Sequence, residues 1–391
     1  MNILQVISSF PPAYAYGGAL KVAYELSKQL VRNGHGITVY TTDVYNANSR
    51  FKCSENPTYI DGIKVHRFRN ISNKLAHNNL PIAPATARAL KRNITDFDVV
   101  HIHEYRSLQA MAAHHYARKR GIPYVLQAHG SLPRIMAKQR LKNLYDSLWG
   151  YRLLKDASKV IALTETEAVQ CKSMGVNGDK IGIVPNGIDL SEFENLPKRG
   201  EFRKKWRIND GQKIILYLGR IHKIKGLDLL AKAFAGLSKK LAEARLVIVG
   251  PDDGYLSSLK KLIADLEIGD KALFTGPLYG QEKLEAYVDA DVHVSPRAWE
   301  PFGLTLIESC ACGTPVICSK GCGIADLIDG KVGLAVPYDK DQLSNAIMRM
   351  LGNDKMTREF GENGKLLVRE QFNWSKIAEQ VENTYEECRI G

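Results

Sequence analysis

The sequence predicts an α/β protein of two doubly wound, Rossmann-like domains facing each other across a cleft, and three observations support this. Short apolar runs alternate with stretches of helical periodicity along the chain. Such runs are typical of strands buried on both faces, which require helices on both sides of a parallel sheet. The pattern occurs twice, and the turn formers at 185–187 separate the two series.

The expected elements follow in order along the chain. Apolar runs predict strands in the first half at residues 3–7, 36–41, 99–102, 124–127 and 159–163. The second half repeats the pattern with strands at residues 214–218, 245–249, 272–274, 292–294 and 315–318. Helical periodicity is clearest at residues 20–33 and 227–242. We therefore assign residues 1–186 and 187–373 to two domains, and a final amphipathic helix at 374–391 that can pack back on the first.

Length and composition exclude several classes of protein. The chain has 391 residues, of which 45% are hydrophobic and 25% charged, which excludes disordered, fibrous and small disulfide-stapled proteins.

The N-terminal segment MNILQVISSFPP reads as a strand entering a loop and not as a signal peptide. We expect a cytoplasmic protein. If it works at a membrane, we expect it on the inner face of the cell membrane. Cys310, Cys312, Cys318 and Cys322 form no paired metal knuckles and are expected to be buried thiols.

The positive charge is confined to one half. The net charge is +12, and residues 1–190 hold 25 Lys and Arg against 13 Asp and Glu, whereas residues 191–391 hold 29 of each. A cationic excess of this kind attracts an acidic partner such as nucleic acid, an anionic membrane or an anionic substrate. The partner is therefore expected to meet the first domain.

The segment from Glu300 to Glu308 directly follows a predicted strand. Its two carboxylates flank a turn at Gly303, and the second lies inside the helix that follows. Free N–H groups at the start of a helix bind anions. Glu300 would accept hydrogen bonds from sugar hydroxyls beside that anion, and Glu308 would reach the diol of a ribose. The alternative is a capped helix with two solvated glutamates.

A second segment, residues 219–228, places cations at the end of another strand. Arg220 and Lys225 are suited to neutralising a diphosphate, Arg220 by bidentate contact and Lys225 as a point charge. Asp252-Asp253 lies in a Gly-Pro-Asp-Asp-Gly context and reads as a turn, not as a metal site.

Glycines and histidines occupy strand ends in the first half. Gly17 and Gly18 precede the first helix and leave its N-terminus open to a phosphate. His129 ends a predicted strand before a glycine, which favours contact with substrate over a structural role. His101 reads as structural. We expect His101 and His103 to be directed to opposite faces, so that the pair binds no metal.

These residues resemble the retaining glycosyltransferases of family 4 (glycosyl transferases group 1), which have the GT-B fold. The resemblance covers nearly all of the chain. It is carried by the E-x7-E segment 300–308 with its continuation 311–316, the loop 219–226, the linker 185–189 and the turn at 17–18.

The resemblance implies a role for each matching residue in the donor half. Arg220 and Lys225 would hold the nucleotide diphosphate, and Glu308 would bind the ribose. Glu300 would position the donor sugar together with the turn formed by Phe302, Gly303 and Leu304.

The resemblance also implies roles in the first domain. Gly17 and Gly18 would approach the phosphate, and His129 would lie near the reacting sugar as a fourth catalytic group beside Glu300, Arg220 and Lys225. Such enzymes use no metal or other cofactor, because cations and helix dipoles stabilise the leaving diphosphate. The donor would be a nucleotide sugar, most often a UDP-sugar.

The basic first half would then bind the acceptor, a glycan or lipid-linked saccharide in polysaccharide or glycoconjugate synthesis. Residues 134–155 mix cations and apolar side chains at near-helical spacing, which is typical of a helix on an anionic bilayer or of a core-facing helix with a solvated rim.

Enzyme alternatives are a nucleotide-sugar epimerase or a phosphorylase of the same fold. Nucleic-acid binding is the alternative from another class, but no nucleic-acid-binding motif supports it, so nucleic acid is not the expected partner.

Overall fold

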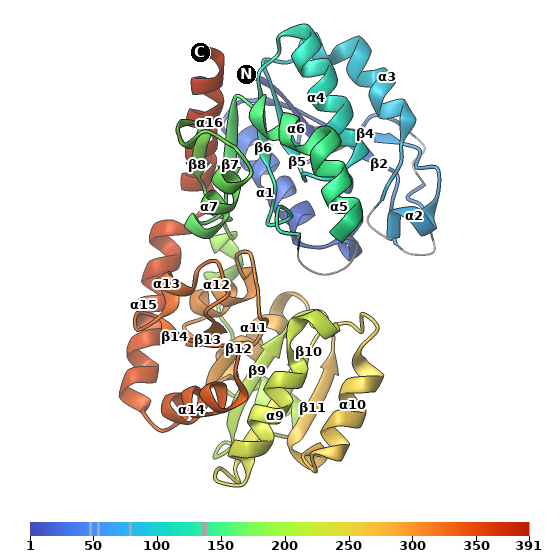
Figure 1. Ribbon diagram of the computed structural model, residues 1–391. Coiled ribbons are helices and arrows are strands. Elements are labelled where there is room, and N and C mark those ends of the chain that lie inside the picture. Colours follow the sequence, from blue (N-terminus) through green and yellow to red (C-terminus); the bar gives the residue numbers. More distant parts are fainter. Residues whose placement is uncertain (47–48, 53–54, 78–79, 135–138, 391) are drawn as a thin grey trace. The chain divides into compact units, whose positions relative to one another are not determined.

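The computed structural model describes residues 1–46, 49–52, 55–77, 80–134 and 139–390, and it divides the chain into two compact units (Figure 1). The first unit contains Met1–Gly187 and Trp374–Gly391, and the second contains Ile188–Asn373. Each is a parallel or nearly parallel sheet between helices, which confirms the predicted α/β class with two doubly wound domains.

The first unit contains an eight-stranded sheet in the order β3-β4-β2-β1-β5-β6-β7-β8, in which only β3 is antiparallel to its neighbour. Its strands are β1 (Asn2–Val6), β2 (Gly36–Thr42), β3 (Thr58–Ile60), β4 (Ile63–Phe68), β5 (Val99–His103), β6 (Tyr124–Gln127), β7 (Lys159–Ala162) and β8 (Ile181–Ile183). Its helices are α1 (Gly18–Arg32), α2 (Asn73–His77), α3 (Pro84–Asn93), α4 (Leu108–Arg120), α5 (Gln139–Tyr145), α6 (Tyr151–Lys155), α7 (Glu165–Ser173) and α16 (Trp374–Ile390).

The second unit contains a six-stranded sheet, all parallel, in the order β11-β10-β9-β12-β13-β14. Its strands are β9 (Lys213–Leu218), β10 (Ala244–Val249), β11 (Ala272–Gly276), β12 (Val292–Ser295), β13 (Val316–Ser319) and β14 (Gly333–Val336). Its helices are α8 (Glu201–Trp206), α9 (Leu227–Ser238), α10 (Leu256–Asp265), α11 (Gly280–Asp289), α12 (Leu304–Ala311), α13 (Ala325–Ile328), α14 (Lys340–Leu351) and α15 (Asp354–Gln371).

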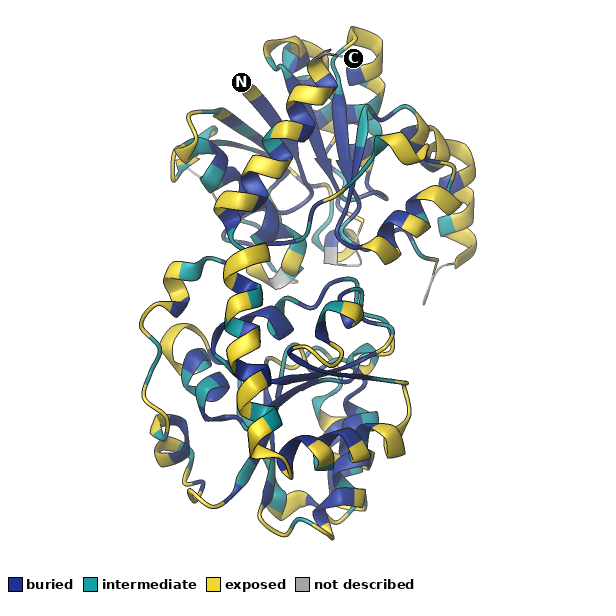
Figure 2. Ribbon diagram, turned by 90° about the vertical axis from the view of Figure 1, so that its left-hand side faces the viewer, coloured by how far each residue is buried: buried dark blue, intermediate teal, exposed yellow. Residues whose placement is uncertain are grey.

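Both sheets are buried by their helices, as the apolar strand sequences require. The central strands are buried along nearly their whole length, whereas the covering helices expose one face (Figure 2). In α1 the buried side chains recur every three or four residues, at Leu20, Ala23, Leu26 and Leu30. This spacing places them on one helix face, which packs on the sheet.

Each sheet has one point at which the strand order reverses. In the first unit the chain moves outward from β1 to β2 and later resumes on the other side of β1 with β5; in the second, β9 is followed by β10 on one side and by β12 on the other. The loops that leave the two neighbouring strands turn in opposite directions there. Ligands of doubly wound sheets bind at this point, beyond the carboxyl ends of the strands.

The C-terminal helix α16 returns to the first unit and packs beside α1 (Figure 1). The carboxylate of Glu382 accepts a hydrogen bond from Asn33 and contacts His35. Tyr385 is fully buried, and its hydroxyl lies 2.7 Å from Nδ1 of His101 in β5. The helix thus completes the core of the unit that begins with the N-terminus.

Several local predictions from the sequence differ from the structure. Strands β3, β4 and β14 were not predicted, although the alternating burial of β4 is the pattern of a half-covered strand near a sheet edge. Within 134–155 the described residues form α5, a π-helical turn at Asp146–Gly150 and α6, while 135–138 lie outside the described residues. No helix among the described residues is long and apolar enough to cross a bilayer.

The contact between α16 and β5 can be tested with Tyr385→Phe. This substitution removes the hydroxyl that meets Nδ1 of His101 and leaves a buried ring nitrogen without its partner. We expect the free energy of unfolding to fall by about 1–3 kcal/mol. Tyr59→Phe, at an exposed tyrosine of the same unit, is the control. Equal denaturation midpoints for the two variants would show that the contact adds nothing to stability.

Candidate functional site

The carboxylate of Glu300 lies between two cations at the strand-order reversal of the second unit. Lys225 follows β9 and its Nζ lies 3.0 Å from Oε2 of Glu300, which follows the neighbouring strand β12. Nη1 of Arg297 lies 3.0 Å from the same oxygen. The structure therefore brings together the predicted pair Lys225 and Glu300, and it adds Arg297.

The two cations keep Glu300 ionised. Burial raises the pKa of the Glu300 carboxyl, but the attraction of Lys225 and Arg297 outweighs burial, so that the pKa lies below its ordinary value. The Glu300 carboxylate is therefore an acceptor for hydrogen bonds at neutral pH. Its remaining lone pairs are available to hydroxyl groups.

Backbone packing fixes the segment that carries Glu300. A Cβ at Gly226, whose φ is 73°, would lie 2.4 Å from the carbonyl oxygen of Pro296. On the other side, a Cβ at Gly321 would lie 1.9 Å from the carbonyl oxygen of Ala298. The amide of Glu300 also donates to the carbonyl of Gly321. Glycine is required on both sides because the neighbouring backbones leave no room for a side chain.

The N-terminus of helix α12 follows directly. Its N-cap is Gly303, with φ of 88° and no side chain to satisfy the first-turn amides at Leu304 and Thr305. Amides in this position bind anions. The side chain of Phe302 is buried against Phe372, with ring centroids 5.7 Å apart, so the predicted donor contact of Phe302 is available only through its backbone.

Glu308 lies further along α12 in a cluster of its own. Lys283 Nζ lies 3.1 Å from Oε1, and the hydroxyl of Tyr287 donates to Oε2 over 3.1 Å. Both partners come from α11. Only about a tenth of the Glu308 side chain is exposed, and the ion pair fixes its orientation.

Arg220 does not contact Glu300 but forms an exposed ion pair with Asp253 at 2.7 Å. The adjacent Asp252 accepts hydrogen bonds from the amides of Gly254, Tyr255 and Leu256, which confirms the predicted turn. Since Arg220 pairs only at the surface, its guanidinium can change partner at little cost.

In the first unit, the predicted residues lie at the carboxyl edge of the sheet. Gly17, with φ of 106°, is the N-cap of α1, which begins at Gly18 without a side-chain cap. His129 follows β6, and its Nε2 lies 2.8 Å from Nδ1 of His103. The amide of Gly130 donates to the buried carboxylate of Glu167, which holds this turn in place.

The expectation that His101 and His103 are directed to opposite faces is wrong. Their rings stack with centroids 4.0 Å apart. Residues two apart in a strand share a face, because successive side chains alternate. Among the described residues no three His, Cys, Asp or Glu side chains are grouped to hold a metal ion.

Three site residues were missed in the sequence: Arg297, Lys283 and Tyr287. Arg297 stands three residues before Glu300, and this short spacing is the only local signal that could have revealed it. Lys283 and Tyr287 are four residues apart on α11 and thus share a helix face, but nothing in the sequence links that face to Glu308.

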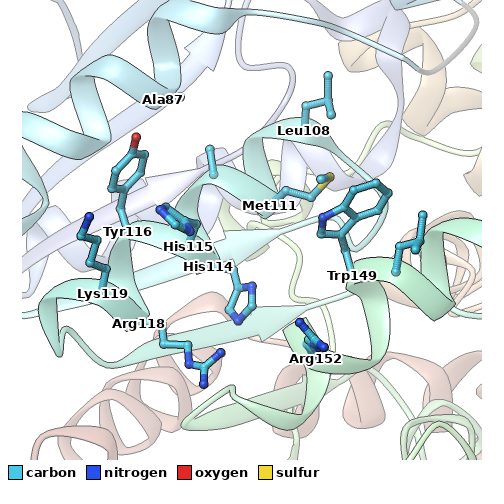
Figure 3. Close-up of a pocket in the computed structure, with 12 residues that line it drawn as sticks. Ala87, Leu108, Met111, His114, His115, Tyr116, Arg118, Lys119, Trp149 and Arg152 are labelled. Atoms are coloured by element: carbon cyan, nitrogen blue, oxygen red, sulfur yellow. The ribbon is translucent and has the colours of Figure 1, made fainter.

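A groove of about 790 Å³ lies on the first unit (Figure 3). It is lined mainly by α4 and by the segment from the π-helical turn into α6, with Arg118 and Lys119 on one side and Trp149 and Arg152 on the other. Apolar side chains of α5 and of the π-helical turn that follows it are exposed to solvent: Leu141, Leu144, Leu148 and Trp149. Among the described residues, Lys119 and Arg152 have no acidic partner.

Comparison with known proteins identifies both halves of the chain. Residues 16–192 match the family model Glycosyltransferase Family 4, and residues 198–367 match Glycosyl transferases group 1. The chain is 28% identical to an uncharacterized glycosyltransferase of Methanocaldococcus jannaschii, covering 98% of both proteins. It is 30% identical to a D-inositol 3-phosphate glycosyltransferase of Pseudarthrobacter chlorophenolicus over 72% of this chain and 69% of that protein.

Solved structures share the fold. Anabaena HepE in complex with UDP and glucose superposes with a TM-score of 0.79 at 20% identity, covering 99% of each chain. Together with the two sheets described above, these matches assign the architecture and the enzyme class. The chain belongs to glycosyltransferase family 4 (glycosyl transferases group 1) and is a glycosyltransferase of the GT-B fold.

Proposed function

We propose that this glycosyltransferase moves a sugar from a UDP-sugar to a glycan or lipid-linked saccharide, with retention of the anomeric configuration and without a metal. The observation that carries the proposal is the contact of Lys225 and Arg297 with Glu300 beside the open N-terminus of α12. Cations, amides and a carboxylate at one strand-order reversal can serve both an anionic leaving group and the hydroxyls of a sugar. Family membership supports none of the epimerase, phosphorylase or nucleic-acid alternatives.

The donor would be held by residues of the second unit. Lys225 and Arg220 bind the diphosphate, and the amides after Gly303 add partial positive charge. Glu308 accepts hydrogen bonds from the ribose hydroxyls, since Lys283 and Tyr287 hold its carboxylate in a fixed orientation. Glu300 and the backbone of 302–304 orient the sugar. The presence of UDP and glucose in the HepE structure supports UDP as the nucleotide.

The chemical step replaces one bond by another at the anomeric carbon. The acceptor oxygen forms a bond to that carbon as the bond to the diphosphate oxygen breaks, and the acceptor proton passes to the leaving diphosphate on the same face. Lys225, Arg220 and the α12 amides stabilise the negative charge that develops on the diphosphate. Glu300 orients the donor and forms no covalent intermediate. On the first unit, Gly17 and Gly18 would approach the phosphate and His129 the sugar.

The acceptor would meet the first unit at the anionic inner face of the cell membrane. This unit carries 27 Lys and Arg against 16 Asp and Glu. Lys119 and Arg152 line the same groove as the exposed Leu148 and Trp149. Figure 3 shows Arg152 on the side of Trp149 and Lys119 on the other side of the groove. Cations with adjacent apolar and aromatic side chains favour the interface of an anionic bilayer. We therefore propose peripheral attachment through this groove and helix α5.

Substitutions of the ion pair test the site. Glu300→Gln and Lys225→Ala should each lower kcat by at least about 100-fold, since each removes a group that acts on the charged or reacting part of the donor. The measurement is transfer from a radiolabelled UDP-sugar.

Lys223→Ala is the matched control for Lys225→Ala, because Lys223 is an exposed cation two residues away with no acidic partner among the described residues. It should retain nearly wild-type activity. Full activity of Lys225→Ala or Glu300→Gln, in variants whose circular dichroism is unchanged, would refute the site assignment.

Ligand-induced stabilisation tests the donor and the metal-free mechanism together. A UDP-sugar should raise the melting temperature more than GDP- or ADP-sugars, because a ligand present at 100 times its Kd stabilises the folded state by about 2.7 kcal/mol. The shift should be the same in EDTA. A shift that disappears on chelation would overturn metal independence, and a larger shift with another nucleotide sugar would overturn UDP.

Vesicle binding tests the membrane surface. The double variant Lys119→Glu/Arg152→Glu should bind vesicles of anionic phospholipid at least about tenfold more weakly, since each cation near such a surface contributes about 1 kcal/mol. Lys239→Glu/Lys240→Glu makes the same charge change at exposed residues of the second unit and should bind as the wild type does. Equal binding by the two double variants, measured by co-sedimentation, would remove the groove from the proposal.

A further inference from the structure

Two consecutive hydrogen bonds connect Gln5, His103 and His129, which come from three adjacent strands near their carboxyl ends. Oε1 of Gln5, in β1, lies 2.5 Å from Nε2 of His103, in β5. Nδ1 of His103 lies 2.8 Å from Nε2 of His129, which follows β6. β1, β5 and β6 are adjacent in the sheet, and their register places Gln5 opposite His101 and His103 opposite Gln127, so His103 and His129 lie progressively further toward the carboxyl edge than Gln5.

The hydrogen-bonded side chains are buried, and the two histidines among them are neutral. Gln5 and His103 are almost fully buried, and His101 stacks on His103 from the other side. Burial lowers the pKa of His129 to about 4, and burial together with the neighbouring rings lowers that of His103 well below its ordinary value. At neutral pH each ring therefore carries a single N–H, and its position on the ring is a choice between two tautomers.

The hydrogen bonds decide that choice. The amide oxygen of Gln5 can only accept, so Nε2 of His103 must carry the hydrogen and Nδ1 of His103 must carry a lone pair. That lone pair accepts from His129, so the hydrogen of His129 lies on Nε2. Nδ1 of His129 is left as a lone pair, and this nitrogen is buried without a hydrogen-bond partner among the described residues.

We propose that Gln5 and His103 are positioning residues that hold His129 as the Nε2–H tautomer, with Nδ1 free to accept a hydrogen bond from a sugar hydroxyl. This rests on the proposed function, in which His129 lies near the reacting sugar. His103 acts only through His129. The backbone supports the same orientation, because His129 adopts the left-handed region with φ of 49° and the following amide of Gly130 is bound by Glu167.

The tautomer itself is the first test and does not depend on activity. The protein is labelled with ¹⁵N-histidine, and long-range ¹H–¹⁵N correlation spectra distinguish protonated from unprotonated ring nitrogens. The ten histidines are assigned by single substitutions, including His129→Gln. We expect a protonated Nε2 and an unprotonated Nδ1 for His129 in the wild type, and a mixture of tautomers in His103→Phe. A wild-type His129 protonated on Nδ1 would overturn the inference.

Kinetics provide the second test. His103→Phe keeps a buried ring but removes the acceptor for His129, and kcat should fall on the order of 10- to 100-fold, as when the hydrogen-bond partner of a metal-bound imidazole is removed. KM for the UDP-sugar should change much less, because Lys225 and Arg220, the cations proposed to hold the diphosphate, lie on the second unit, whereas His103 belongs to the first. His103→Asn should restore part of kcat, since its amide oxygen can take the place of Nδ1 and accept from His129.

His101→Phe is the matched control. It replaces another ring of the same stack and removes the contact with Tyr385, but it touches no atom of His129. It should lower stability and leave kcat close to the wild type. An equal loss of kcat in His101→Phe and His103→Phe would reduce the role of His103 to packing.

Failure of this inference differs from failure of the proposed function. If the wild type neither binds nor uses a UDP-sugar, the proposed function is wrong, whereas the tautomer measured by NMR still stands or falls by itself. If the wild type transfers sugar and His103→Phe does so at the same rate, the proposed function survives and the positioning role of His103 is refuted.

Discussion

The candidate donor site depends on one buried carboxylate that two cations share. Burial alone would raise the pKa of the Glu300 carboxyl, and the attraction of Lys225 and Arg297 brings it below its ordinary value. The three groups come from the loops after β9 and β12, the two strands between which the order of the sheet reverses. The sheet thus supplies the geometry, and the tight glycine contacts at 226 and 321 keep the loop that carries Glu300 from moving away.

The sequence predicted those features of the site that follow from local order. Strand ends, the glycine before α12 and the cation at 225 could be predicted. Each lies where an apolar strand sequence changes to polar or glycine residues before the next helix of a βα unit. Lys283 and Tyr287 were not visible, since their contact with Glu308 joins α11 to α12 through packing alone. The edge strand β14 was missed because its sequence, Gly-Leu-Ala-Val, contains a glycine and an alanine, which favour strands only weakly.

The two units carry different kinds of electrostatics. In the second unit, the charged side chains at the site are few and form ion pairs. The arrangement of these pairs, and not an excess of one charge, would therefore decide which donor binds. In the first, the excess of cations is spread over α3, α4 and the segment 139–155, and exposed apolar side chains accompany it. The buried histidines of the same unit carry no charge, in contrast to its exposed cations. The nitrogen that carries the hydrogen decides which side of each ring donates and which accepts.

The return of α16 to the first unit has a consequence for synthesis on the ribosome. The second unit is continuous in the chain, so all of its residues are made before α16. The first unit begins earlier but lacks Tyr385 and the rest of α16 until the second unit has been made. The first unit therefore completes its core only after the second has been synthesised, and until α16 joins it the β5 face, with His101 and its neighbours, stays uncovered and in need of protection from aggregation.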